Sequence, residues 1–184
     1  KISAGYNKAV SFDRTVAWFA NPDWGLGLPF PALLAFLATA TELVGGLLLL
    51  IGLLTRYVSI PLMFTMVVAM ATVHWPHGWF AIAPGNPATS TALPLAKLGI
   101  PAAQASLENS EEVGKRLSRA RQILRENGNY EWLTEKGGLV ILNNGIEFAM
   151  TYFIMLLVLF FQGAGRFLSV DYWIERWLAP GVNV

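Results

Sequence analysis

Three long stretches of the chain carry almost no charge, and they dominate its pattern of apolar and polar positions. The first has 32 residues and one charge, at Glu42, the second has 40 residues and no formal charge, and the third has 27 residues and one charge, at Glu147. The stretches are Trp24–Thr55, Tyr57–Ala96 and Leu139–Gly165. Because a helix that crosses a bilayer needs about 20 mostly apolar residues, each stretch is long enough to cross a membrane.

Proline and glycine set the expected boundaries of three membrane-spanning helices. Pro29 and Pro31 suit the start of a helix, Pro76 cannot continue the second span, and Gly163 with Gly165 is expected to end the third. The predicted spans are about Phe30–Leu54, Val58–Trp75 and Leu139–Phe161. The turn between the first two spans, at Arg56, is short, so we expect these helices to pack antiparallel.

Residues 1–19 have the pattern of a further helix. They contain Gly5-Tyr6-Asn7-Lys8 and then the apolar residues Phe12, Val16, Trp18 and Phe19, and we expect them to end a helix that began before Lys1. The predicted fold is an all-α membrane protein, a four-helix transmembrane bundle with the first span largely missing from this chain. Residues 1–75 would hold the end of the first span with the second and third, and residues 139–184 the last span and a tail.

Residues 76–138 differ in kind and are predicted to form an insertion outside the bilayer. Residues 84–101, rich in Pro, Ala and Thr, have the composition of an extended loop. An amphipathic helix is predicted at about residues 110–127, where Asn109 and Glu112 have the spacing of a capping box. This helix could cap the mouth of the bundle or provide a docking surface for a partner.

Composition supports a membrane protein and excludes several kinds of chemistry. Charged residues make up 14% of the chain, well below the roughly 25% of soluble domains, and the net charge of +1 gives no indication of nucleic-acid binding. The absence of cysteine excludes disulfides, thiolate metal sites and iron–sulfur clusters. With two histidines, a three-histidine metal site within one chain is also excluded.

Glu42 and Glu147 are the candidate catalytic residues. A carboxylate that faces lipid costs a few kcal/mol or more, so each should face the bundle interior. Small residues surround Glu42, and the same helical face as Glu147 carries Asn143, Asn144 and Thr151. We therefore expect a polar seam between the first and last spans, with both acids lining it. It would serve either as a proton-accepting or polar head-group site, or as structural hydrogen bonding between helices.

Burial of these acids favours the neutral form or pairing with a cation. The cations that lie close enough in the predicted fold are Lys8, Arg14 and Arg56. Lys8 and Arg56 are therefore candidate ligand-binding residues as well, together with His74 and Trp75 at the end of the second span.

A row of methionines and histidines follows one stripe of the second predicted span. Its members are Met63, Met66, Met70, His74 and His77. Thioethers and imidazoles suit Cu(I), so the stripe is a candidate copper site. Methionine is also a common filler of gaps between apolar helices, which gives the alternative of simple packing.

Several short motifs resemble those of the DoxX family of small bacterial membrane proteins. They are Thr41-Glu42-Leu43-Val44-Gly45-Gly46, Gly52-Leu53-Leu54-Thr55-Arg56, Gly5-Tyr6-Asn7-Lys8, Asn144-Gly145-Ile146-Glu147 and Gly163 to Asp171. Val73-His74-Trp75-Pro76 further resembles a branch found beside copper-binding peptide maturation enzymes. The resemblance implies a four-helix bundle with cytoplasmic termini, a multi-pass location in the bacterial inner membrane, and a periplasmic insertion. The positions of Arg56, Arg166 and Arg176 agree with that orientation.

Three functions are consistent with the sequence. The first, which the family resemblance also implies for some members, is a quinone-linked redox subunit that uses the intramembrane carboxylates and depends on a redox partner. The second is a non-catalytic accessory or assembly subunit of a membrane complex, which would contact other membrane or periplasmic subunits. The third is a copper-related membrane protein.

Overall fold

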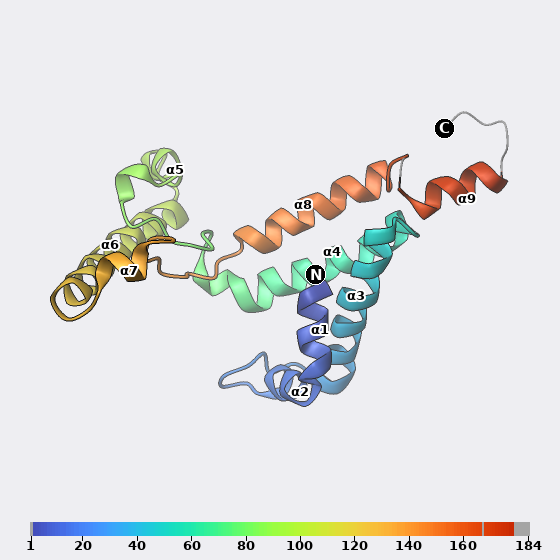
Figure 1. Ribbon diagram of the computed structural model, residues 1–184, viewed down its shortest axis with the longest axis horizontal. Coiled ribbons are helices and arrows are strands. Elements are labelled where there is room, and N and C mark those ends of the chain that lie inside the picture. The colour runs from blue at the N-terminus through green and yellow to red at the C-terminus, as the bar shows by residue number, and fades with distance from the viewer. Residues whose placement is uncertain (1, 167, 179–184) are drawn as a thin grey trace. The chain divides into compact units, whose positions relative to one another are not determined.

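The computed structural model describes residues 2–166 and 168–178, and these residues form helices, loops and one isolated β-bridge. Two compact units divide the chain: the first combines residues 1–73 and 149–184, and the second is residues 74–148. Helices of the first unit are α1 (Ile2–Val10), α2 (Phe12–Ala20), α3 (Pro31–Ile51), α4 (Thr55–Ala69), most of α8 (Glu147–Gln162), and α9 (Val170–Leu178). Figure 1 shows their order along the chain.

Helix α3 is apolar outside and polar inside. Its exposed side chains are large and apolar, among them Phe36 and Leu50, whereas its buried residues are small or polar. The buried set is Ala35, Thr39, Glu42, Gly45 and Gly46. A core helix of a soluble protein would show the reverse, so this arrangement indicates a helix that faces lipid. Only 28% of its most apolar window is buried.

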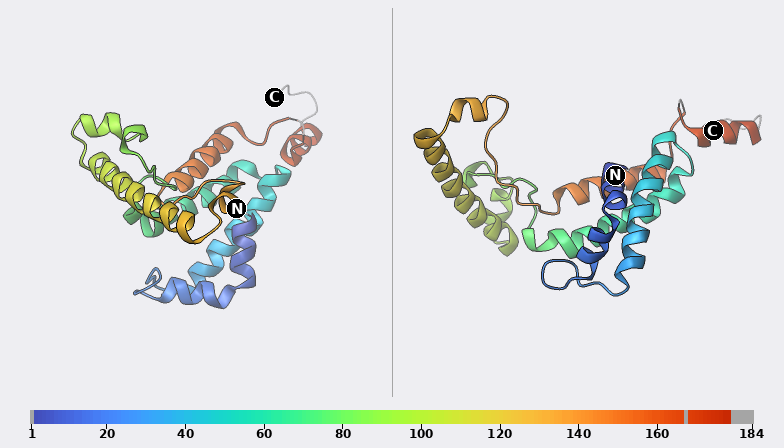
Figure 2. Two further views of the ribbon diagram at one scale, coloured as in Figure 1. Left: turned by 60° about the vertical axis from the view of Figure 1, so that its left-hand side comes forward. Right: turned by 60° about the horizontal axis from the view of Figure 1, so that its bottom comes forward.

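Glycines allow α1 to pack directly against α3. A Cβ atom at Gly5 would lie 2.6 Å from the backbone nitrogen of Leu43, and one at Gly46 would lie 2.8 Å from the Ile2 side chain. Figures 1 and 2 show α1 lying along α3. The helical character expected for this segment is confirmed over residues 2–19, although the chain breaks into α1 and α2 at Ser11, and Lys1 lies outside the described residues.

Helix α4 continues through a π-helical segment, η1 (Met70–His74), and a 3₁₀ turn, η2 (Trp75–His77). Together Thr55–His77 form the second helix long and apolar enough to cross a membrane, and Pro31–Ile51 is the first. Both agree with the predicted spans within a few residues. Leu62 and Met66 of α4 pack against Leu156 of α8 in the buried apolar cluster of this unit.

The prediction that the last span begins at Leu139 is wrong. Helix α8 begins at Glu147 and has 16 residues, which is short for a membrane crossing. Before it, Leu142 forms an antiparallel bridge with Ile82, and Asn144 takes a left-handed conformation with φ of 59°. An apolar run can be extended as well as helical, and hydrogen bonds to residues 78–81 fix the extended form here.

The second unit is built around a long amphipathic helix, α6 (Pro101–Asn127), accompanied by η3 (Pro87–Thr89), α5 (Leu93–Lys97) and α7 (Tyr130–Thr134). Val113 and Leu117 of α6 pack with Ala83 in its apolar cluster. The helix predicted at 110–127 is confirmed, but it starts nine residues earlier. Asn109 is therefore not a cap: its amide lies within the helix and donates to Asn143 Oδ1 at 3.4 Å.

Candidate functional site

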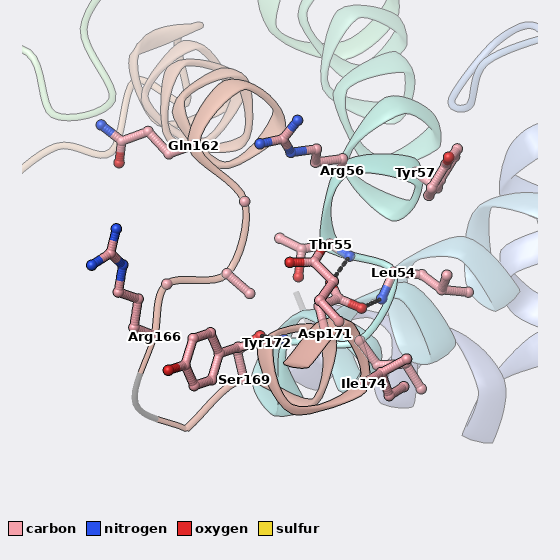
Figure 3. Close-up of a pocket in the computed structure, with 15 residues that line it drawn as sticks. Leu54, Thr55, Arg56, Tyr57, Gln162, Arg166, Ser169, Asp171, Tyr172 and Ile174 are labelled. Atoms are coloured by element: carbon pink, nitrogen blue, oxygen red, sulfur yellow. Dashed lines mark hydrogen bonds between the residues drawn. The ribbon is translucent and has the colours of Figure 1, made fainter. Parts of the chain in front are cut away.

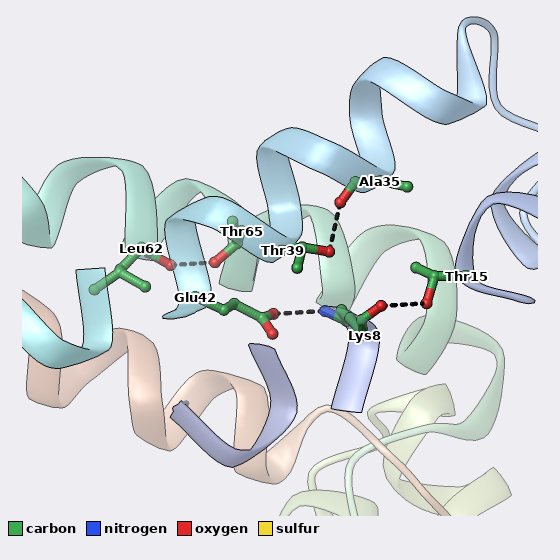
Figure 4. Close-up of polar contacts among 7 residues, drawn as sticks. All are labelled: Lys8, Thr15, Ala35, Thr39, Glu42, Leu62 and Thr65. Carbon is green, nitrogen blue, oxygen red and sulfur yellow. Dashed lines mark hydrogen bonds and ion pairs between the residues drawn. The ribbon is translucent and has the colours of Figure 1, made fainter. Parts of the chain in front are cut away.

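The side chains of Glu42 and Lys8 form an ion pair between α3 and α1. Lys8 Nζ donates to Glu42 Oε1 at 2.8 Å, as Figure 4 shows. Glu42 points away from the apolar outer side of α3 because its buried neighbours, Thr39 and Gly46, leave room for α1 to approach. Of the two states expected for this acid, neutral or paired with a cation, the structure has the pairing, with Lys8 as the partner.

The second oxygen of this carboxylate is free. Glu42 is 5% exposed, and its Oε2 atom is buried without a hydrogen-bond partner among the described residues. A buried carboxylate oxygen with no donor is costly, which suits a place where a ligand hydroxyl or a proton binds. The Lys8 side chain is 28% exposed and has further N–H groups beyond the one that binds Glu42. The pair therefore offers an acceptor and donors side by side.

Glu147 has a different role from that of Glu42. It belongs to the second unit, where its Oε2 atom accepts a hydrogen bond from the backbone N–H of Ala81 at 2.9 Å. Its own N–H donates to the carbonyl of Trp79 at 3.0 Å. Glu147 thus fastens the first turn of α8 to the loop after η2. The joint action of Glu42 and Glu147 in one seam stays a prediction.

Three other predicted site residues hold the same loop. The Asn143 amide donates to the carbonyls of His77 and Phe80, and His74 Nδ1 lies 2.8 Å from the carbonyl oxygen of Asn144. The prediction that Asn143 and Asn144 share a helical face with Glu147 is wrong, because both residues precede α8 and Asn144 has a left-handed conformation. The Asn143 amide and the His74 ring both contact backbone carbonyls, which supports a structural role for them at this position.

Two further candidates are Trp75 and Thr151. Trp75 is 70% exposed, in keeping with an aromatic anchor at a membrane boundary. Thr151 lies on an exposed position of α8, in the first unit.

The methionine stripe contributes to packing. Met66 is buried in the cluster with Leu62, and Met63 packs against that cluster. Met70 opens the π-helix, whose wider turn alters the angular spacing from Met70 to His74 that the stripe assumed. No group of three His, Cys, Asp or Glu side chains that could hold a metal forms within the described residues. Copper binding by the thioethers stays a prediction, and packing is the alternative that these contacts favour.

The structure adds a residue that the sequence analysis did not select, Asp171. Its carboxylate accepts from the backbone N–H groups of Leu54 and Thr55, at 2.7 and 2.9 Å, and so caps the start of α4. Its own N–H donates to the carbonyl of Gly52 at 2.9 Å. Gly52 has φ of 65°, and a Cβ there would lie 2.9 Å from Ser169. Gly52 and Asp171 both lie in sequence motifs that resemble those of the DoxX family. That resemblance was the signal in the sequence that could have identified Asp171.

Comparison with known proteins gives one match. No curated protein and no solved structure matches the chain. The family model described as DoxX matches residues 2–75, which contain α1 to α4 and the Lys8–Glu42 pair. The resemblance inferred from the motifs is thereby confirmed over this segment, and residues 2–75 belong to the DoxX family of membrane proteins.

Proposed function

We propose that this protein is a multi-pass inner-membrane protein whose DoxX segment binds the polar head of a quinone-class carrier at Lys8 and Glu42. The observation that supports it is the ion pair of 2.8 Å with a buried, unpartnered Glu42 Oε2. A quinone carries two carbonyl oxygens, and a quinol two hydroxyl groups, on an apolar ring and tail. An acceptor beside an ammonium within an apolar helix pair matches both forms.

In this proposal, Glu42 acts through its unpaired oxygen, Oε2, and Lys8 acts through the ammonium N–H groups that do not bind Glu42. Glu42 Oε2 accepts the hydroxyl hydrogen of a quinol and takes its proton when the quinol is oxidised. Lys8 donates to the carbonyl oxygen that remains. Oxidation of a quinol releases two electrons and two protons, so a partner protein with a redox centre takes the electrons, and water-accessible groups take the second proton.

Binding of a soluble short-chain quinone to the purified chain in detergent tests this proposal. A variant with both Lys8→Met and Glu42→Gln removes the two charges together and keeps similar side-chain volumes. We expect its quinone affinity to fall at least about tenfold, the loss of one good hydrogen bond to a charged group. Arg14→Gln, on the exposed face of α2, serves as a control and should bind like wild type. If the double variant bound the quinone with the same affinity as the wild-type chain, the proposal would be wrong.

An accessory subunit is the second candidate, and one feature of α6 favours it. Arg116, Arg119 and Arg125 are exposed along a helix whose buried face is narrow. Nearby, the Lys115 ammonium has a pKa above its ordinary value because Glu112 and Glu111 accept its hydrogen bonds. An acidic partner subunit would fit the arginine face.

The accessory function has its own test. A variant with Arg116→Glu and Arg119→Glu should lose a partner that co-purifies with the wild-type chain after chemical cross-linking. The variant Lys136→Glu, an exposed charge outside α6, is the control. Retention of every partner by the α6 variant would exclude this docking surface.

A further inference from the structure

Three helix ends of the first unit meet around a cavity that is separate from the Lys8–Glu42 pair. Helix α3 ends at Ile51, α4 begins at Thr55 and α8 ends at Gln162. A cavity of about 450 Å³ lies there, and Figure 3 shows Arg56, Arg166 and Tyr172 around it. Among the described residues, α3 and the helix from Thr55 to His77 are long and apolar enough to cross a membrane, so their shared turn would lie at a membrane–water boundary.

Two arginine side chains without an ion-pair partner among the described residues line one side of the cavity. Arg56 and Arg166 both line it, and neither forms an ion pair within the part of the chain that the structure describes. Two carboxylates also line it. Asp171 has both oxygens engaged by the N–H groups at the start of α4, and Glu175 is exposed on α9. The guanidinium groups therefore remain free to bind an anion from outside the chain.

A buried hydroxyl without a partner completes the site. Thr55 lines the cavity, is 1% exposed, and its Oγ1 atom has no hydrogen-bond partner among the described residues. A buried hydroxyl is normally hydrogen-bonded, so an orphaned one beside a cavity indicates a missing acceptor. Ser169, in contrast, is satisfied: its hydroxyl donates to the Gly52 carbonyl and accepts from the Tyr172 N–H.

We propose that this cavity binds a phosphate group, that of an anionic phospholipid headgroup, through Arg56, Arg166 and the Thr55 hydroxyl. Guanidinium groups bind phosphate oxygens through paired hydrogen bonds, and the hydroxyl donates to a third oxygen. Basic pockets between helix ends at the boundary are places where membrane proteins hold lipid headgroups. Tyr172 lies where an interfacial ring would flank the glycerol region.

Titration of the detergent-purified full chain with short-chain phosphatidylglycerol tests the site, with phosphatidylcholine and inorganic phosphate as further probes. Arg56→Gln and Arg166→Gln should each weaken phosphatidylglycerol binding about tenfold, the loss of a charged hydrogen bond. Thr55→Val should weaken it severalfold while leaving the unfolding temperature without lipid unchanged or higher, because it removes the orphaned hydroxyl. Glu175→Gln should tighten binding severalfold, and Arg14→Gln is the matched control.

Each outcome decides the proposal. Competition by millimolar inorganic phosphate would support the phosphate site and identify the free ion as a ligand, whereas binding of phosphatidylglycerol without such competition would identify the lipid. Wild-type affinity in both arginine variants would overturn the proposal. Equal affinity for phosphatidylcholine would also overturn it, since binding would then not depend on the net negative charge of an anionic headgroup. If an arginine variant fails to fold, the other two variants still test the proposal. Phosphatidylglycerol should bind more tightly to Glu175→Gln and more weakly to Thr55→Val, and the opposite changes would overturn it.

Discussion

At the scale of single residues, the two acids of the apolar runs have distinct environments. Glu42 lies between α1 and α3, with one carboxylate oxygen paired with Lys8 and the other without a hydrogen-bond partner among the described residues. The Glu147 carboxylate instead accepts a hydrogen bond from the backbone N–H of Ala81. The sequence could identify both, because acids in apolar runs are costly wherever they occur. It could not assign their partners, since Lys8 is 34 positions from Glu42 and Ala81 is 66 positions from Glu147.

Substitutions of Lys8 and Glu42 should have non-additive effects on the stability of the fold, because the two side chains form an ion pair. Removing one partner of a buried pair costs about 3–5 kcal/mol, and less is expected here because the Lys8 side chain is 28% exposed. Thermal unfolding in detergent should show a larger loss for Glu42→Gln or Lys8→Met alone than for the double variant. Additive losses in the double variant would show that the two side chains do not interact.

Gly145 should tolerate no side chain. A Cβ there would lie 2.5–2.6 Å from the carbonyl oxygens of Phe80, Gly78 and Trp79, so Gly145→Ala must displace the turn that starts α8. We expect a loss of about 2 kcal/mol or more of unfolding free energy, measured by denaturant titration. Gly138→Ala, with nothing within 4 Å, is the control and should change stability little. Equal effects of the two substitutions would contradict the described turn.

At the scale of elements, apolar runs and their proline and glycine ends predicted α3 and α4 closely. The start of α8 was missed because residues 139–146 are apolar enough for a helix, and hydrogen bonds to residues 78–81 decide their extended form. The start of α6 was missed because Asn109 looked like a cap. Pro101 provides the true start, since proline suits a first helical turn.

The cap of α4 comes from a distant helix. Leu54 at its N-cap position has no side-chain cap of its own, and the Asp171 carboxylate supplies one from α9. Asp171→Ala should therefore lower the free energy of unfolding by about 1–2 kcal/mol in detergent melts. Asp23→Ala, in an exposed turn, is the control. A loss no greater than that of the control would mean that α4 does not need this cap.

At the scale of the whole molecule, the chain combines a lipid-facing unit with one built around the amphipathic α6. The large exposed apolar residues of α3 and its small buried ones support membrane insertion, and DoxX membership of residues 2–75 agrees. The four-helix bundle and the periplasmic side of the insertion stay predictions, because within the described residues two helices are long and apolar enough to cross a membrane and no membrane side is defined.

The chain has no cysteine, so single introduced cysteines report topology without background. We expect Ser118→Cys on α6 and Glu175→Cys on α9 to react with a membrane-impermeant maleimide from opposite sides of the membrane. Leu47→Cys, on the exposed face of α3, should be protected by lipid. Labelling of Ser118→Cys and Glu175→Cys from the same side would contradict the predicted orientation.

The most direct measurement of the central claim is the position at which a photoreactive quinone analogue attaches to the full chain in its membrane. The account predicts cross-links within α1 and α3 near Lys8 and Glu42, lost when unlabelled quinone is added in excess. Cross-links confined to other helices, or insensitive to that competition, would contradict it.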